Sequence, residues 1–140
     1  VGSEMCIRDS LYTYVDKAYK TQELIREIFD RFYLPEPSGL CGNDDCGQMS
    51  AWYIFSAMGF YPVNPVGGEY IIGAPQLKRI VLHLPENKTF TVEAVNLSKQ
   101  NKYVKAVALN GQEITDFRIQ HKDILAGGHL IFTMSDKPGN

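Results

Sequence analysis

The spacing of apolar residues changes along this chain, and that change constrains the fold more than any other feature. Between Thr21 and Tyr33, apolar residues recur on one face of an amphipathic helix, and charged residues occupy the opposite face. After Gly67-Gly68, apolar and polar residues alternate, as they do in half-buried strands. We therefore expect an α+β fold, with helices before the region 65–68 and antiparallel strands after it.

The second half of the chain divides into short runs that predict strands. Asn110-Gly111 lies between two of them and is a strong signal for a two-residue hairpin turn. The predicted strands are Glu69–Ile72, Arg79–Leu84, Thr89–Ala94, Lys102–Leu109, Gln112–Thr115, Phe117–Ile119 and His129–Met134. We expect them to form a small antiparallel β-sandwich over residues 67–140, packed against the helical part.

A loop with two adjacent carboxylates, Asp44 and Asp45, leads into a second predicted helix that begins near Met49. This helix is apolar on almost every side, so we expect it to be buried all round. Gly59 offers a left-handed end for the helix, and Pro62 prevents the helix from resuming. The two acids would then project from deep structure, a setting in which acid chemistry can be tuned.

Two roles are open for these carboxylates. Asp45 and Gln48 fit a capping box, and either acid would complement the helix dipole. One cap explains neither the second carboxylate nor the flanking Gly42 and Gly47, which allow a ligand to approach the backbone closely. The acids are therefore also candidates for catalysis. The two roles are compatible, because a cap would hold a catalytic carboxylate still.

Other polar and aromatic residues have weaker functional interpretations. Trp52 is a candidate for stacking on a sugar, but on an apolar helix a tryptophan is more often part of the core. His121 and Asp123 suggest a dyad, yet their place in a loop favours local turn and capping hydrogen bonds. Cys41 and Cys46 flank the acidic loop, and both a local disulfide and a reduced pair are open.

Composition argues against several functional classes. The formal net charge is −2 with mixed signs, so no basic surface indicates nucleic-acid binding. No apolar run approaches the roughly 18 residues of a membrane span. The partners that we expect therefore include neither nucleic acid nor a membrane.

Residues 42–63 read GNDDCGQMSAWYIFSAMGFYPV. This run resembles the signature of glycoside hydrolase family 92, whose members are calcium-dependent exo-acting α-mannosidases that invert the anomeric configuration. The resemblance continues through 19–22, 32–33, 70–75, 109–111, 121–124 and 127–128. It covers roughly residue 11 to the end.

The resemblance implies a domain arrangement. Residues 11–66 would be the C-terminal helices of an (α/α)6 catalytic barrel, and residues 67–140 the β-sandwich that follows it. Residues 1–10 resemble a translated sequencing adapter and lack the apolar core of a signal peptide, so we expect a non-native leader. The chain would then be a C-terminal fragment, and its missing N-terminal part would be its main protein partner. The full-length protein is expected to be periplasmic or secreted.

The resemblance also implies roles for the acidic loop. An inverting glycosidase needs an acid that protonates the leaving oxygen and a base that deprotonates water, about 6.5–9.5 Å apart. Neighbours such as Asp44 and Asp45 cannot bracket a sugar from both sides, and in the family the acid is a Glu well upstream. By the family pattern Asp45 is the better base and Asp44 the second candidate. Asn43, where many members carry Asp, and Gln48 are expected to bind substrate.

The expected function is the removal of terminal α-linked mannose from glycans, as in N-glycan degradation, with this fragment inactive alone. Calcium is the implied cofactor, and its ligands cannot be assigned to residues of this chain. One alternative is a non-catalytic carbohydrate-binding or structural β-sandwich module. Another is a different (α/α)6-barrel glycosidase.

Overall fold

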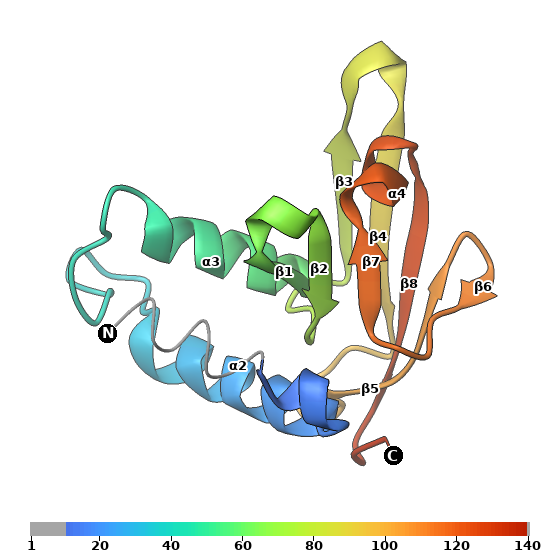
Figure 1. Cartoon of the computed structure of the whole chain (residues 1–140). Helices are drawn as coiled ribbons and strands as arrows, with labels where there is room; N and C mark the ends of the chain where they lie inside the picture. The colour runs from blue at the N-terminus through green and yellow to red at the C-terminus, as the bar shows by residue number, and fades with distance from the viewer. Residues whose placement is uncertain (1–10, 140) are drawn as a thin grey trace.

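The computed structural model describes residues 11–139, and the expected leader at 1–10 lies outside the described residues (Figure 1). Three α-helices are present in that range: α2 (Ala18–Phe32), α3 (Gln48–Met58) and α4 (His121–Leu125). Short 3-10 helices are η1 (Leu11–Val15), η2 (Pro65–Gly67) and η3 (Pro85–Asn87). The strands are β1 (Phe60–Asn64), β2 (Glu69–Ile72), β3 (Arg79–His83), β4 (Thr89–Val95), β5 (Tyr103–Leu109), β6 (Gln112–Glu113), β7 (Arg118–Gln120) and β8 (Gly128–Ser135).

The strands form two sheets. The smaller has the order β1-β2-β7, and the larger has the order β3-β4-β8-β5-β6. Figure 1 shows α2 and α3 on one side of the molecule and the larger sheet on the other. The two sheets share one apolar core, to which Phe60 and Ile72 contribute from the smaller sheet and Phe90 and Phe132 from the larger.

The expectation of a wholly antiparallel sandwich is wrong at one position. β4 and β8 run parallel, in register from Phe90 opposite Gly128 to Val95 opposite Thr133. The chain leaves β4, forms β5, β6, β7 and α4, and then inserts β8 between β4 and β5. A parallel pair needs such a long connection. Alternation of apolar residues sets which side chains face the core, but it does not encode strand direction.

The change of period near residue 65 predicts most of the strands correctly. Each predicted strand occurs within two residues of its expected ends, and no helix of three turns lies between residues 76 and 120. Asn110 and Gly111 have φ values of 51° and 84°, and they join paired residues Leu109 and Gln112. Positive φ at both positions is the geometry of the tight hairpin turn that the sequence predicts.

The sequence did not reveal β1, so the sheets begin before the expected boundary. Gly59, with φ 98°, ends α3 as expected, and Phe60 already pairs with Ile72. Pro62 lies inside β1, where the pairing register shifts between Tyr61 and Asn64. A proline is tolerated in a strand at such an irregularity, so Pro62 marks the strand as well as the end of the helix.

The helices differ from expectation at two places. α2 begins at Ala18, so Thr21 lies inside the helix, where it is 1% exposed. The segment of His121 and Asp123, expected to be a loop, forms α4, and an Asp123 carboxylate oxygen accepts a hydrogen bond from the Gln120 backbone N–H at 3.1 Å. The capping role predicted for Asp123 is therefore confirmed. His121 Nδ1 lies 3.0 Å from the Tyr70 hydroxyl.

A second apolar cluster joins α2 to α3. Trp52 is 3% exposed and packs against Phe29 and Tyr33, with ring centroids 5.5 and 5.6 Å apart. The core role predicted for Trp52 is thus confirmed. Polar contacts attach α2 to the larger sheet: the Gln22 side-chain oxygen accepts a hydrogen bond from the Val104 N–H at 2.9 Å.

The expectation that α3 is buried on all sides is wrong for this chain. Met49 and Trp52 are buried, but Tyr53 is 41% exposed and Ile54 57% exposed. Among the described residues, α2 and β1 pack against α3, and the side of α3 that carries Ile54 stays largely exposed. An (α/α)6 barrel is not formed by the two long helices described here. No helix within residues 11–139 is long and apolar enough to cross a membrane.

Candidate active site

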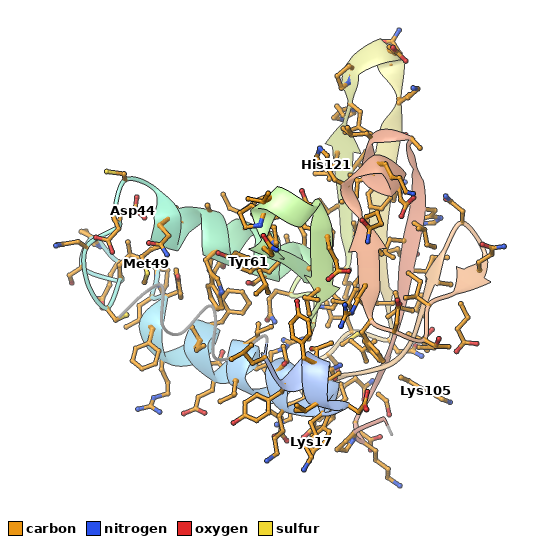
Figure 2. The ribbon with its side chains drawn as sticks, in the orientation of Figure 1. Lys17, Asp44, Met49, Tyr61, Lys105 and His121 are labelled. Carbon is orange, nitrogen blue, oxygen red and sulfur yellow. The ribbon has the colours of Figure 1, made fainter. Side chains whose placement is uncertain are left out.

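The loop between α2 and α3 carries the candidate residues, and its first half is folded back on itself. Tyr33 forms an isolated bridge with Leu40, and the Leu34 N–H donates to the Gly39 carbonyl at 3.0 Å. A Cβ at Gly39 would lie 1.9 Å from the Leu34 carbonyl oxygen, so only glycine fits there. This turn returns the chain to the start of α3, where Asp44 and Met49 lie near each other in Figure 2.

The backbone before α3 is left-handed at three successive positions. The φ values are 50° at Asp45, 59° at Cys46 and 93° at Gly47. Such values are uncommon for residues other than glycine. Gly47 is the N-cap of α3 and makes no side-chain cap bond, so the capping box predicted for Asp45 and Gln48 is wrong. The reason is that the left-handed run places Asp45 two residues before the helix cap.

Asp44 performs the capping. One of its carboxylate oxygens accepts a hydrogen bond from the Ser50 N–H at 3.0 Å and another from the Ser50 hydroxyl at 2.8 Å. The Met49 N–H donates to the Asp44 carbonyl at 3.1 Å, and the Gln48 N–H donates to the Asp45 carbonyl at 3.3 Å. The first N–H groups of α3, which have no partner within a helix, are thereby satisfied.

Asp45 differs from Asp44 in its surroundings. Its side chain is exposed, and its carboxylate has no hydrogen bond or ion pair with any residue of the described range. The side chains of Asn43, exposed, and Gln48, half-buried, likewise make no hydrogen bond within that range. Three of the four predicted site residues thus present unengaged polar groups at the start of α3, while Asp44 is held by Ser50.

The cysteines beside this loop are both thiols. Cys41 and Cys46 are free and exposed. Of the two states that the sequence left open, the structure has the reduced one. Neither side chain has a hydrogen bond with the described residues.

An apolar groove beside the loop does not contain the acids. It has a volume of about 570 Å³ and lies between the folded-back turn and the exposed side of α3. Its lining includes Leu34, Pro37, Ser50, Tyr53 and Ile54. Because neither Asp44 nor Asp45 lines it, we do not take this groove as the catalytic cavity.

The fit of these residues to calcium is poor. Within residues 11–139 no three His, Cys, Asp or Glu side chains come together in a way that would hold a metal ion. Calcium takes six to eight oxygen ligands. One oxygen of Asp44 is already committed to Ser50. The described residues therefore do not form a calcium site by themselves.

Comparisons with known proteins agree on one family. Residues 9–136 match the model of the glycosyl hydrolase family 92 catalytic domain. A protein of Arthroderma benhamiae, described as an uncharacterized secreted glycosidase, is 37% identical over 127 residues, which are 89% of this chain and 16% of that protein.

Two solved structures from Bacteroides thetaiotaomicron are similar in fold and sequence. A family 92 α-mannosidase is 43% identical, with a TM-score of 0.89 over 95% of this chain and 18% of its own length. An inverting mannosidase of the same family is also 43% identical, with a TM-score of 0.87 over 94% of this chain and 18% of its own. The chain thus spans less than a fifth of the length of these relatives. On these matches, the chain belongs to glycosyl hydrolase family 92.

Proposed function

We propose that this chain is the C-terminal part of an inverting exo-α-mannosidase and that Asp45 is its general base. The observation that carries the assignment is the contrast between the two acids. Asp44 is engaged by the Ser50 N–H and hydroxyl, whereas the Asp45 carboxylate is free of partners within the described residues. A general base must be able to reach a water molecule. The mannosidase activity of the two bacterial relatives supports the choice of substrate.

In this proposal, Asp45 takes a proton from a water molecule as the water attacks the anomeric carbon from the face opposite the leaving group. The acid that protonates the leaving oxygen stands on the other side of the sugar, roughly 6.5–9.5 Å from the base. It comes from the part of the full-length enzyme outside this chain. Asn43 and Gln48 are proposed to bind the sugar or the water, because their side-chain amides are close in sequence to Asp45 and are not engaged elsewhere in the described range.

The full-length protein is further proposed to be periplasmic or secreted, to require calcium, and to place α2 and α3 in an (α/α)6 barrel. The exposed apolar side of α3 supports the barrel, since a helix that is apolar all round is typical of the interior of a larger domain. No step assigned to Asp45 depends on calcium. The chain alone is expected to show no turnover of any α-mannoside, because the acid and most of the sugar-binding surface lie elsewhere.

The test of the base is kcat for Asp45→Asn in the full-length enzyme, with Asp44→Asn as the matched control. Asp45→Asn is expected to lower kcat by roughly 10²–10⁴-fold, the usual contribution of a positioned general base. Substrates with good leaving groups are affected as well, because their hydrolysis still requires activation of water. Turnover near the wild-type rate in Asp45→Asn would contradict the assignment. A large loss in Asp44→Asn alone would move the base to Asp44.

A further inference from the structure

The hairpin between β5 and β6 carries a dipeptide with a chemistry of its own. Asn110 and Gly111 form the turn that joins Leu109 to Gln112, and both turn residues are exposed. Asparagine is a chemically labile residue, and it deamidates fastest before glycine, which has no side chain to shield its backbone nitrogen. Figure 1 shows this hairpin on the opposite side of the molecule from the loop before α3. The chemistry of the turn is therefore separate from the proposed hydrolysis.

Deamidation at this turn needs no reactant other than water. The Gly111 nitrogen attacks Cγ of Asn110, so that a new N–Cγ bond closes a succinimide ring. The Cγ–Nδ2 bond breaks, and Nδ2 leaves as ammonia together with the proton of the Gly111 N–H. Water then adds to one of the two ring carbonyls and opens the ring to aspartate or to isoaspartate. Nothing is oxidised or reduced in either step.

In the folded hairpin, the Asn110 side chain is anchored to the neighbouring strand β8. Its Oδ1 accepts a hydrogen bond from the His129 N–H at 2.8 Å, and the Asn110 N–H donates to the His129 carbonyl at 2.8 Å. The side-chain amide also lies against Gly128, where a Cβ would be 2.2 Å from Oδ1 and 2.8 Å from Cγ. While these contacts are made, the amide is not free to turn onto the Gly111 nitrogen.

We propose that Asn110 is a deamidation site that the folded hairpin protects, and that it reacts when its contact with β8 opens. Local opening of an exposed turn requires less free energy than unfolding of the whole domain. Where opening and closing are fast compared with the chemistry, the rate follows the fraction of molecules that are open. The two hydrogen bonds to His129 are expected to slow the reaction roughly tenfold to a hundredfold.

The two products are expected to differ in their effect on the hairpin. Aspartate keeps a side-chain oxygen that accepts from the His129 N–H, and Asp-Gly is favoured in the same two-residue turn. Isoaspartate routes the main chain through its own side-chain carbons and so lengthens the backbone by one carbon. A two-residue turn has fixed geometry and does not accommodate that extra carbon. Isoaspartate at position 110 should therefore release this end of β5 from β8.

The direct test follows deamidation by peptide mass spectrometry in the full-length protein at mildly alkaline pH, folded and in urea. Asn87 is the matched control, because it is also exposed with a positive φ, of 56°, but is followed by Lys88. In urea, Asn110 is expected to react faster than Asn87. In the folded protein, the Asn110 rate is expected to fall roughly tenfold to a hundredfold. Equal Asn110 rates in both states would overturn the protection, and no excess over Asn87 in urea would overturn the site.

Gly128→Ala tests whether the contact with β8 is what protects Asn110. The added Cβ occupies the place of the Asn110 amide, so the rate in the folded variant is expected to rise toward the rate in urea. An unchanged rate in a folded Gly128→Ala protein would contradict the proposed protection. If this variant does not fold, the comparison of folded and unfolded wild type decides alone.

Limited proteolysis of aged wild-type protein tests the difference between the products. Chains with isoaspartate at position 110 are expected to be cleaved at the hairpin several-fold faster than chains with aspartate, because local opening exposes the backbone. Asn110→Asp is the control variant, and it should resist cleavage as wild type does. Equal shares of both products in the cleaved and intact fractions would contradict the proposed effect of isoaspartate.

Discussion

The two halves of this molecule differ in how completely they cover their apolar side chains. In the β half, Phe90, Leu130 and Phe132 are each 0% exposed, and residues of both sheets surround them. In the helical half, α3 buries Trp52 but leaves Ile54 57% exposed. The core of the β half is thus closed within the described residues, although single apolar side chains such as Leu77 and Val95 are exposed on its surface, while α3 presents an open apolar side. The candidate base, Asp45, lies in the open half.

This difference separates the part that stabilises the chain from the part that carries the candidate catalytic residues. A closed core gains its full apolar burial from residues of the same chain, so its stability should depend little on what surrounds it. An open apolar side gains its burial only from a neighbour. The site at the start of α3 is therefore expected to depend on the rest of the enzyme for both its walls and its rigidity.

The sharpest test of this comparison is to truncate one apolar residue from each half in two proteins, the 140-residue chain and the full-length enzyme. Phe132→Ala is expected to cost about 3–5 kcal/mol in both the 140-residue chain and the full-length enzyme, because residues of this chain already bury Phe132 completely. Ile54→Ala is expected to change stability by less than about 0.5 kcal/mol in the chain. In the full-length enzyme it is expected to cost about 2–5 kcal/mol, since the barrel would cover it.

The measurement is the free energy of unfolding in urea for both variants in both proteins. Trp52→Ala is the control on α3, because Trp52 is buried already within the chain and should be costly in each protein. Equal, small effects of Ile54→Ala in chain and full-length enzyme would mean that the open side of α3 is not covered. The barrel placement of α3 would then be wrong.

The next prediction separates the two acids by stability instead of rate. Asp44→Ala is expected to cost about 0.5–2 kcal/mol, because it removes the carboxylate that accepts from the Ser50 N–H and hydroxyl. Asp45→Ala is expected to stay within about 0.5 kcal/mol of wild type, because its carboxylate has no partner within the described residues. Thermal melts of the two variants, run side by side, give the comparison. A larger loss for Asp45→Ala than for Asp44→Ala would show that the capping role is misassigned.

The sequence predicts the two halves unequally well, for physical reasons. In the β half, alternation and turn chemistry are local signals, so the strand positions and the Asn110-Gly111 turn follow from neighbouring residues. The parallel pairing of β4 with β8 could not be predicted, because direction depends on the path of the intervening chain. The sequence does not predict β1, because Pro62 is a residue that ends helices and here also lies in an irregular strand.

For the candidate site, the sequence correctly predicts that an acidic loop leads into α3 but misassigns the capping residue. The pattern Asp45 to Gln48 satisfies the spacing of a capping box, and nothing local indicates that Asp45, Cys46 and Gly47 all adopt positive φ. That run shifts the helix start and gives the capping role to Asp44 instead. Ser50, the partner of Asp44, was not singled out. Its place as the third residue of the helix was the only signal that could have found it.

The smallest expected effect concerns one of the contacts that join the two halves. The Tyr103 hydroxyl of β5 donates a hydrogen bond to the Glu23 carboxylate of α2, and this bond, with burial, raises the pKa of Tyr103 to about 12. The pKa of a tyrosine in an unfolded chain is about 10. Because the folded-state pKa is the higher one, the contact contributes its full stability below pH 10 and loses it as the pH rises toward 12.

Tyr103→Phe is therefore expected to cost about 0.5–1.5 kcal/mol at pH 8. The gap in unfolding free energy between wild type and variant should narrow from pH 10 to 12. Urea unfolding of both proteins across this range measures the gap. Glu23→Gln is the matched variant, because it keeps an acceptor without the charge. It should lower the folded-state pKa of Tyr103, so that the pH-dependent loss of stability is smaller and ends at a lower pH. A gap that stays constant up to pH 12 would show that the Tyr103 hydroxyl does not link the helical half to the β half.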